Sequence, residues 1–322
     1  FQTKLLSVKF YDKHQFAELN LHDASCRFKG AKTRIQMNQI HFSDPVQSTL
    51  YPPEVISSKT TENAALSLSI KPNHISFKLN NVTVFIHYHI IRRFIHLFSL
   101  PQTDFTIELK NTRWIVPVAF KKADEMLNLT IDGTFKKSKL FQGSINSLSA
   151  YFYELNGVQY DSIISNFAFN FAKDKSKISL EINPIDINFA LNDVASFNVL
   201  VRSLGKFIKK EKLSLPLEKI NEISIESKPI TFILNSDRYK TISLFKFTIK
   251  QISLHNNQES KLIFDHVLYN DIENQMWKIF LNAFSVNVKI VSKKNQFGLH
   301  VDIADLLNIN FSYCAVQLFL KY

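Results

Sequence analysis

The sequence predicts an all-β protein that consists mostly of antiparallel sheet, with a few short helices. Apolar residues occupy alternate positions along most of the chain, and a long phrase occurs twice. Alternation with a period of two places successive side chains on opposite faces of a strand. The positions between the apolar residues hold mostly Ser, Asn, Lys and Thr, which is typical of a sheet with only one face in water.

The repeated phrase occupies residues 67–82 and returns without a gap at residues 179–194. The two copies agree at most apolar positions and differ mainly at the polar positions between them. A repeat that keeps one apolar face predicts stacked units, each of which extends the sheet of its neighbour.

The strands are predicted wherever apolar residues alternate between short polar breaks. These sets are Leu68/Ile70, Ile75/Phe77/Leu79, Phe105/Ile107/Leu109, Leu127/Leu129/Ile131, Phe167/Phe169/Phe171, Ile178/Leu180/Ile182, Ile187/Phe189/Leu191, Ile230/Phe232/Leu234, Phe245/Phe247/Ile249, Phe284/Val286/Val288/Ile290 and Leu307/Ile309/Phe311.

Two segments have helical periodicity instead, at residues 82–98 and 194–208, and each follows one copy of the phrase. A unit is therefore predicted to contain strands and then a short helix that crosses back. Without a linker rich in Pro, Gly or Ser, we expect one continuous segment over residues 1–322. Its approximate repeat units are 1–110, 111–225 and 226–322. Because the chain begins at Phe1, we expect it to be a piece of a longer polypeptide.

The formal net charge is +11, which favours association with anionic surfaces. Lys and Arg are spread along the chain, and their clusters do not resemble a nucleic-acid-binding arm, so we expect no nucleic-acid partner. Cys26 and Cys314 give no disulfide framework, which fits a reducing compartment. No apolar run is long enough to span a bilayer as a helix.

The sequence contains no constellation that predicts catalysis. The phosphate-binding, nucleophile-elbow and zinc-protease motifs are missing. His87, His89 and His96 have no acidic or Cys partner at a fitting spacing, and His87 and His89 fall on different faces of a helix. We therefore expect neither an enzyme nor a metal site, and no cofactor.

Several stretches resemble the chorein family, the bridge-like lipid-transfer proteins related to vacuolar protein sorting thirteen. The first is the alternating strand that ends in Leu-Asn-Asn-Val (79–82) or Leu-Asn-Asp-Val (191–194) and runs into an apolar segment. The stretch 36–45, which ends in Asp-Pro, is followed by Tyr-Pro-Pro-Glu-Val-Ile at 51–56. Further on, Trp-Ile-Val-Pro at 114–117 precedes a strand that ends in Asp132-Gly133, where the family has Leu-Gly.

The most specific resemblance lies near the C-terminal end. This part of the chain contains Tyr269-Asn270, Trp277 and the stretches 284–290 and 306–312. Taken in order, they are similar to the Tyr-Asn, Trp-Glu-Pro and Leu-Asn-Ile-Asn-x-Ser series of the family. Lys278-Ile279 replaces the Glu-Pro that follows the Trp, so the match is divergent there. In the family this series lies late in the repeating β-groove.

The resemblance implies an elongated, twisted sheet curved into an apolar groove. It also implies a lipid-transfer segment that binds glycerophospholipids and conducts them between membranes. The protein would be cytoplasmic and peripheral at organelle contact sites, with adaptor proteins bound outside this chain. The predicted groove residues are Ile75, Phe77, Leu79, Phe167, Phe169, Phe171, Ile187, Phe189, Leu191, Phe284, Val286 and Val288.

A closed β-sandwich uses the same alternation, and alternation alone favours it. A structural or protein-binding sandwich without lipid cargo is therefore the alternative. The long repeat, the one-sided pattern and the ordered series of resemblances favour the groove. A register shift of one residue would move a whole strand's apolar set to the other face.

Overall fold

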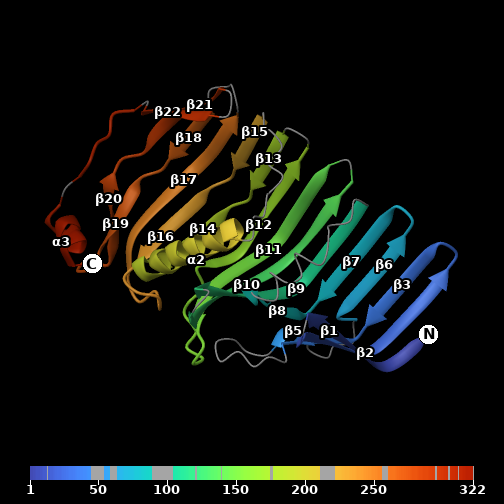
Figure 1. The fold of residues 1–322 in the computed structure, drawn as a ribbon. Helices are drawn as coiled ribbons and strands as arrows, with labels where there is room; N and C mark the ends of the chain where they lie inside the picture. The colour runs from blue at the N-terminus through green and yellow to red at the C-terminus, as the bar shows by residue number, and fades with distance from the viewer. Residues whose placement is uncertain are drawn as a thin grey trace. The chain divides into compact units, whose positions relative to one another are not determined.

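The computed structural model describes the chain except residues 13, 45–53, 59–63, 89–103, 120–121, 139, 175–176, 211–221, 256–259, 294–295, 304, 311 and 322. Within the described part, the strands form one mixed 22-stranded sheet, which confirms the predicted all-β fold (Figure 1). These residues divide into two compact units. Unit 1 comprises 1–159 and 199–213, and unit 2 comprises 160–198 and 214–322. The repeat units expected from the sequence stay a prediction.

Unit 1 is built from long strands and from pairs of short strands that lie end to end. Both β3 and β4 pair with β2. In turn, β6 pairs with β3, and β5 pairs with β4. Both β7 and β8 pair with β9. The strands are β1 Gln2–Asp12, β2 His14–Lys29, β3 Lys32–Met37, β4 Gln39–Ser43, β5 Glu54–Ser58, β6 Leu66–Lys71, β7 His74–Asn80, β8 Val82–Phe85, β9 Asp104–Ala119, β10 Lys122–Lys137 and β11 Phe141–Glu154.

Unit 2 repeats this arrangement. β13 and β14 lie end to end beside β12, β15 and β16 lie beside them, and β17 then pairs with both β15 and β16. The elements are β12 Ile164–Lys173, β13 Lys177–Ile182, β14 Ile185–Ala190, α2 Leu191–Lys210, β15 Glu222–Ser227, β16 Ile230–Asn235, β17 Ser243–His255, β18 Ser260–Phe264, β19 Val267–Asp271, β20 Met276–Leu281, β21 Phe284–Lys293, β22 Gln296–Ile303 and α3 Tyr313–Lys321. The unit boundary falls within α2.

The sheet is mixed because each unit contains parallel neighbours. β7 and β8 run parallel to β9, and β13 and β14 run parallel to β15 and β16. Parallel neighbours need a connection that crosses back between them. Between β14 and β15 that connection contains α2, and the predicted helix at 194–208 lies inside α2.

The predicted helix at 82–98 is wrong at its start. Residues 82–85 form β8, which pairs with both β5 and β9. Val82 and Val84 are buried while Thr83 is not, so a period of two fits this segment as well as the helical period did, and the cross-strand partners decide between them. The part of the prediction from residue 89 onward lies outside the described residues.

The predicted strand through Leu307, Ile309 and Phe311 is also wrong where it is described. Ile309 forms only an isolated bridge with Leu281, and Phe311 lies outside the described residues. The chain continues instead into α3, whose Ala315 and Leu318 are buried against Leu244 and Tyr269.

A line of bulges crosses unit 1. Asn81 between β7 and β8, and Asn111 in β9, have left-handed backbones with φ of 53° and 46°. The register of β10 shifts against β11 between Asp132 and Gly133, and against β9 between Ile131 and Gly133. The Asn111 Nδ2 donates to Asn81 Oδ1 at 2.7 Å, and the Asn111 N–H donates to the Asp132 carboxylate. We call these positions the bulge line of unit 1.

The bulge line keeps the apolar residues on one face. An added residue would move the following side chains to the other face, but a residue in the left-handed region absorbs the shift, and Asn tolerates that region well. Leu79 and Val82, on either side of Asn81, are therefore buried in the same core cluster.

Unit 2 has a corresponding line, made mostly with proline. Asn166 in β12 has φ of 55°, and the breaks at Asn183-Pro184 and Lys228-Pro229 lie side by side. The Lys228 N–H donates to Ile182 O at 2.9 Å, and the Ile185 N–H donates to Pro229 O at 3.1 Å. Proline has no backbone N–H to donate to a neighbouring strand. The hydrogen bonding between strands is therefore interrupted at Pro184 and at Pro229.

Candidate functional site: the apolar face of the sheet

The candidate site is the apolar face of each unit, because cross-strand register joins the alternating sets into continuous lines. In unit 1, between the hairpin ends and the bulge line, one line crosses β3, β6, β7, β9 and β10. Alternate residues of a strand share a face. The residues two positions before and two positions after this line therefore form two further lines on the same face. The first line contains Ile35, Leu68, Phe77, Ile107 and Phe135.

The flanking lines contain two of the other predicted groove residues. Ile75 pairs with Ile70 and with Phe105, and Leu79 pairs with Leu66 and Leu109. The apolar positions of the first copy of the phrase therefore lie together on one face.

The opposite face of the same strands is polar. Ser67, Lys78, Glu108 and Thr134 follow one another in register across β6, β7, β9 and β10. Lys78 and Glu108 form an ion pair at 2.7 Å with both side chains more than 40% exposed. Because such a pair is solvated, it contributes at most about 1 kcal/mol to stability.

Unit 2 shows the same division above its bulge line. Phe169 pairs with Ile182, and Phe171 pairs with Leu180. Leu180 continues to Ile225 of β15. The opposite face is polar. There Asn170 pairs with Glu181, and the register then passes from Glu181 to Glu226, Ser253 and Lys261 on the following strands.

Stacked aromatic rings extend the apolar face across β16, β17, β18 and β21. The rings of Phe232 and Phe247 stack at 4.6 Å, and those of Phe264 and Phe284 stack at 4.5 Å. Phe232 also pairs in register with Ile187 of β14. Close parallel rings add to the stabilisation that burial alone provides.

The predicted groove residues differ in exposure. Leu79, Val286 and Val288 are buried, with 8%, 9% and 7% of their surface exposed. Leu191 does not continue the apolar set of β14, because it is the first residue of α2 and is 54% exposed. The half-buried residues are Ile75, Phe77, Phe167, Phe169, Phe171, Ile187, Phe189 and Phe284.

The apolar face remains accessible at several positions. Ile70, opposite Ile75, is 39% exposed, and Phe28 at the tip of the β2–β3 hairpin is 73% exposed. In unit 2, Val301 and Ile303 pair with Val288 and Val286 and are about half exposed. An apolar ligand could therefore reach these positions.

The helix α3 covers part of the apolar face, which the sequence pattern did not predict. Ala315 and Leu318 pack near Tyr269 and Phe245, and the Tyr269 hydroxyl lies 2.6 Å from the Ser312 hydroxyl. Tyr269 and Phe245 pair in register, which places both on the face that α3 covers. The apolar positions 314, 315 and 318 have helical spacing, and this was the available signal.

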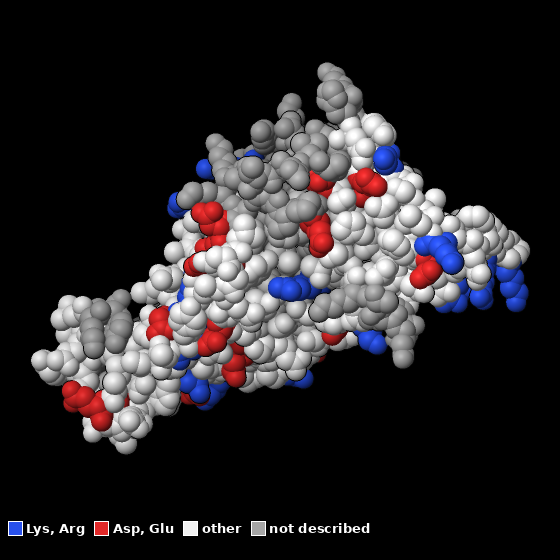
Figure 2. Space-filling model, turned by 90° about the horizontal axis from the view of Figure 1, so that it is seen from below, with Lys and Arg blue, Asp and Glu red and all other residues white. Residues whose placement is uncertain are grey.

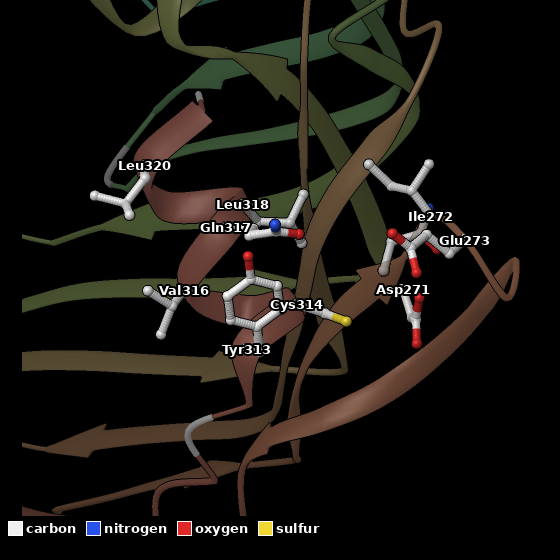
Figure 3. A pocket seen from close by; sticks show the side chains of 10 residues that line it. Asp271, Ile272, Glu273, Tyr313, Cys314, Val316, Gln317, Leu318 and Leu320 are labelled. Carbon is white, nitrogen blue, oxygen red and sulfur yellow. The ribbon is translucent and has the colours of Figure 1, made fainter.

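A cavity of about 580 Å³ lies between α3 and the β19–β20 turn. In Figure 3, Cys314 and Leu318 lie on the side of α3 nearer the turn, and Val316 and Leu320 lie on the other side. Asp271 at the turn is buried and accepts hydrogen bonds from Lys278 and Asn274. The Lys278 hydrogen bond is the main cause that lowers the pKa of Asp271 to about 2, so this carboxylate is a structural anchor.

Another buried carboxylate, that of Asp193, fixes the start of α2. Its Oδ2 accepts the Ala190 N–H at 2.8 Å. Its two oxygens lie 3.1 Å from Arg238 Nε and 3.0 Å from Lys240 Nζ, and its side chain is 1% exposed. A carboxylate in the first helical turn is also favoured by the helix dipole.

The described residues contain no group of three or more His, Cys, Asp or Glu side chains placed to hold a metal ion. Of the helices described, none is long and apolar enough to cross a membrane. No protein-family model matches the chain, and a search of curated proteins finds no matching sequence.

Proposed function

We propose that the apolar faces bind the acyl chains of glycerophospholipids, and that the chain is a segment of a bridge-like lipid-transfer protein of the chorein type. The observation that carries the proposal is the continuity of the apolar lines. Along the sheet, β3, β6, β7, β9 and β10 each add an apolar side chain beside that of the previous strand. A ligand with long apolar chains fits such a surface better than a compact solute does.

The same continuity supports movement along the face. Burying a methylene group is favourable by about 0.8 kcal/mol. If each strand offers a similar apolar surface, this stabilisation changes little as an acyl chain moves from one strand to the next. The headgroup would stay in water, and no bond is made or broken. In the proposed role, lipids are conducted between membranes at organelle contact sites, with adaptors bound outside this chain.

The polar face supports the same role. Ser, Lys, Glu and Thr side chains line the reverse of the strands that carry the apolar lines. A sheet with one solvated polar face and one apolar face can hold a lipid on the apolar face without a second protein layer over that lipid.

The test is lipid mass spectrometry on the purified chain, which is expected to copurify with glycerophospholipids. Phe77→Asp and Phe189→Asp place a carboxylate on the apolar face of unit 1 and unit 2. Desolvating that carboxylate costs more than about 1.4 kcal/mol, so lipid occupancy is expected to fall at least about tenfold.

Ser76→Asp and Asn188→Asp are matched controls. They add the same charge one residue away, on the opposite face, and lipid occupancy is expected to stay at the wild-type level. Circular dichroism establishes that all four variants are folded. Lipid-free wild-type protein, or equal losses in the controls, would reject the proposal and favour a structural or protein-binding role without lipid cargo.

A further inference from the structure

The tip of the β2–β3 hairpin carries four basic side chains on one face. β2 ends at Lys29 and β3 begins at Lys32, with Gly30 in the turn at φ of 57°. The antiparallel register places Arg27 opposite Arg34, and Lys29 opposite Lys32. Because alternate residues share a face, all four lie on the polar face, and all four are exposed. We call these four residues the basic tip.

The charges of the basic tip are not compensated within the described part of the chain. Like charges directly opposite each other on neighbouring strands are destabilising. Among the described residues, no acidic side chain forms an ion pair with any of the four. Lys78 in the same unit, in contrast, is paired with Glu108. A cluster that repels itself and remains exposed fits an anionic partner.

An apolar side chain lies on the reverse of the basic tip. Phe28 is between Arg27 and Lys29 in sequence, so its ring is on the apolar face, where it is 73% exposed. Its register partner Thr33 pairs in turn with Ile70, which is 39% exposed. The hairpin end is therefore amphipathic, with cations on one side and exposed apolar residues on the other.

The next strand along the sheet adds a further cation beside the basic tip. In Figure 2, the basic side chains at the extreme right edge of the view, on the side of the N-terminal strands, have no acidic side chain directly beside them, whereas an acidic and a basic group adjoin further inward. Lys71, at the end of the neighbouring β6, is also exposed. An anionic surface would therefore be attracted by Lys71 as well as by the basic tip.

We propose that the β2–β3 hairpin end docks on an anionic phospholipid surface. The basic tip contacts headgroup phosphates, and Phe28 enters the interfacial region, where aromatic rings are favoured. Nucleic acid fits less well, because binding successive bases takes several aromatic side chains on the face that carries the cations, and the Phe28 ring is on the other face. This inference does not depend on lipid movement along the apolar face.

The experiment is flotation of the purified chain with phosphatidylcholine vesicles, with and without phosphatidylserine. The wild type is expected to bind only the phosphatidylserine vesicles, and binding should weaken as salt rises. Each cation near such a surface contributes roughly fivefold to binding, so neutralising all four should lower binding at least about 100-fold. The test variant combines Arg27→Gln, Lys29→Gln, Lys32→Gln and Arg34→Gln.

A control with the same change in net charge separates a local site from the overall charge. Its residues are two exposed side chains of α2 and two exposed lysines of unit 2, and it should retain more than half of the binding. The control variant combines Arg202→Gln, Lys206→Gln, Lys228→Gln and Lys261→Gln.

Two further measurements complete the test. Phe28→Ser should weaken vesicle binding while the salt dependence stays. The test variant should unfold at the wild-type temperature or above, because only repulsive pairs are removed. Wild-type vesicle binding by the test variant overturns the proposal. Tighter binding of single-stranded DNA than of vesicles at the same salt overturns the choice of partner.

Discussion

The two copies of the repeated phrase fold differently, although their apolar positions agree. In the first copy, β6 and β7 form an antiparallel hairpin, and β8 continues from β7. In the second copy, β13 and β14 lie end to end beside β12, and α2 begins directly after β14. Shared alternation therefore specifies which residues share a face, and the residues between decide the path of the chain.

The first divergence follows the aligned prolines. Pro72 is followed by Asn73, and the hairpin turn joins Lys71 to His74. Pro184 is followed instead by Ile185, which is only 7% exposed and pairs with Ile230. Asn favours turns, whereas a β-branched residue favours an extended, packed strand.

The second divergence is at aligned Asn81 and Asp193. Asn81 takes the left-handed backbone of a bulge and lets the strand continue into β8. Asp193 is paired with Arg238 and Lys240 in the first turn of α2. The two valines that follow therefore differ in burial: Val82, in β8, is 1% exposed, and Val194, in α2, is 48% exposed.

Removing the Asp193 carboxylate should produce the largest loss. Asp193→Ala leaves Arg238 and Lys240 largely buried without a counter-charge, so the free energy of unfolding is expected to fall by about 3–5 kcal/mol. Urea denaturation measures this. Asp193→Asn installs the residue of the first copy and should lose less, since its amide oxygen can still accept hydrogen bonds. A loss below about 1 kcal/mol for Asp193→Ala would show that the ion pairs do not hold α2.

Exchanging the residue after the second proline tests the first divergence. Ile185→Asn removes a buried side chain beside Ile230 and favours a turn, so unfolding free energy should fall by about 3 kcal/mol. Ile185→Val, as the control, keeps the strand and should cost about 1 kcal/mol. Equal losses for the two variants would mean that packing of the δ-methyl group alone accounts for the effect.

The left-handed backbone at Asn81 should make substitution there costly. Asn81→Ala is expected to lower the unfolding free energy by about 1–2 kcal/mol, and it also removes the acceptor for Asn111. Asn81→Gly accepts the same backbone without strain and should lose less. Thermal unfolding of both variants compares them, and a more stable Ala variant would contradict the assigned role of the bulge.

The smallest effect is expected at the hairpin turn. Asn73→Ile gives the first copy the residue of the second copy at an exposed position, and the loss of turn preference should cost about 0.5 kcal/mol. The measurement is hydrogen exchange at the amides of β6 and β7, with Lys71→Asn as the matched exposed control. Unchanged exchange would mean that the proline alone sets the turn.

The alternating sets located ten of the described strands and their apolar residues, namely β6, β7, β9, β10, β12, β13, β14, β16, β17 and β21. Phe167, Phe169 and Phe171 lie in β12 as predicted, and their rings are 5.1 and 6.4 Å apart in sequence order. Alternation does not distinguish parallel from antiparallel neighbours, because both place the same residues on a face. The parallel pairing of β7 with β9 therefore could not be read from the sequence.

The errors have physical causes. At 82–98 a short apolar stretch satisfied both periods, and pairing with β5 and β9 selected the strand. At Leu191 the apolar alternation continued for one residue into α2, because the preceding strand ends where Asp193 stabilises a helix. The bulge line was visible as spacing: Leu79 is followed by Val82, and Ile182 by Ile185, at three residues instead of two.

The bulge line limits how this sequence can change length. Deleting Asn81 would restore strict alternation and leave Val82 and Val84 on the same face as Leu79. The deletion would, however, put β8 one residue out of register with β9, because Asn111 keeps the extra residue of that strand. A matching deletion in β9 would be needed to restore the pairing. We therefore expect related chains to gain or lose residues at the hairpin ends, or together at matching positions of neighbouring strands.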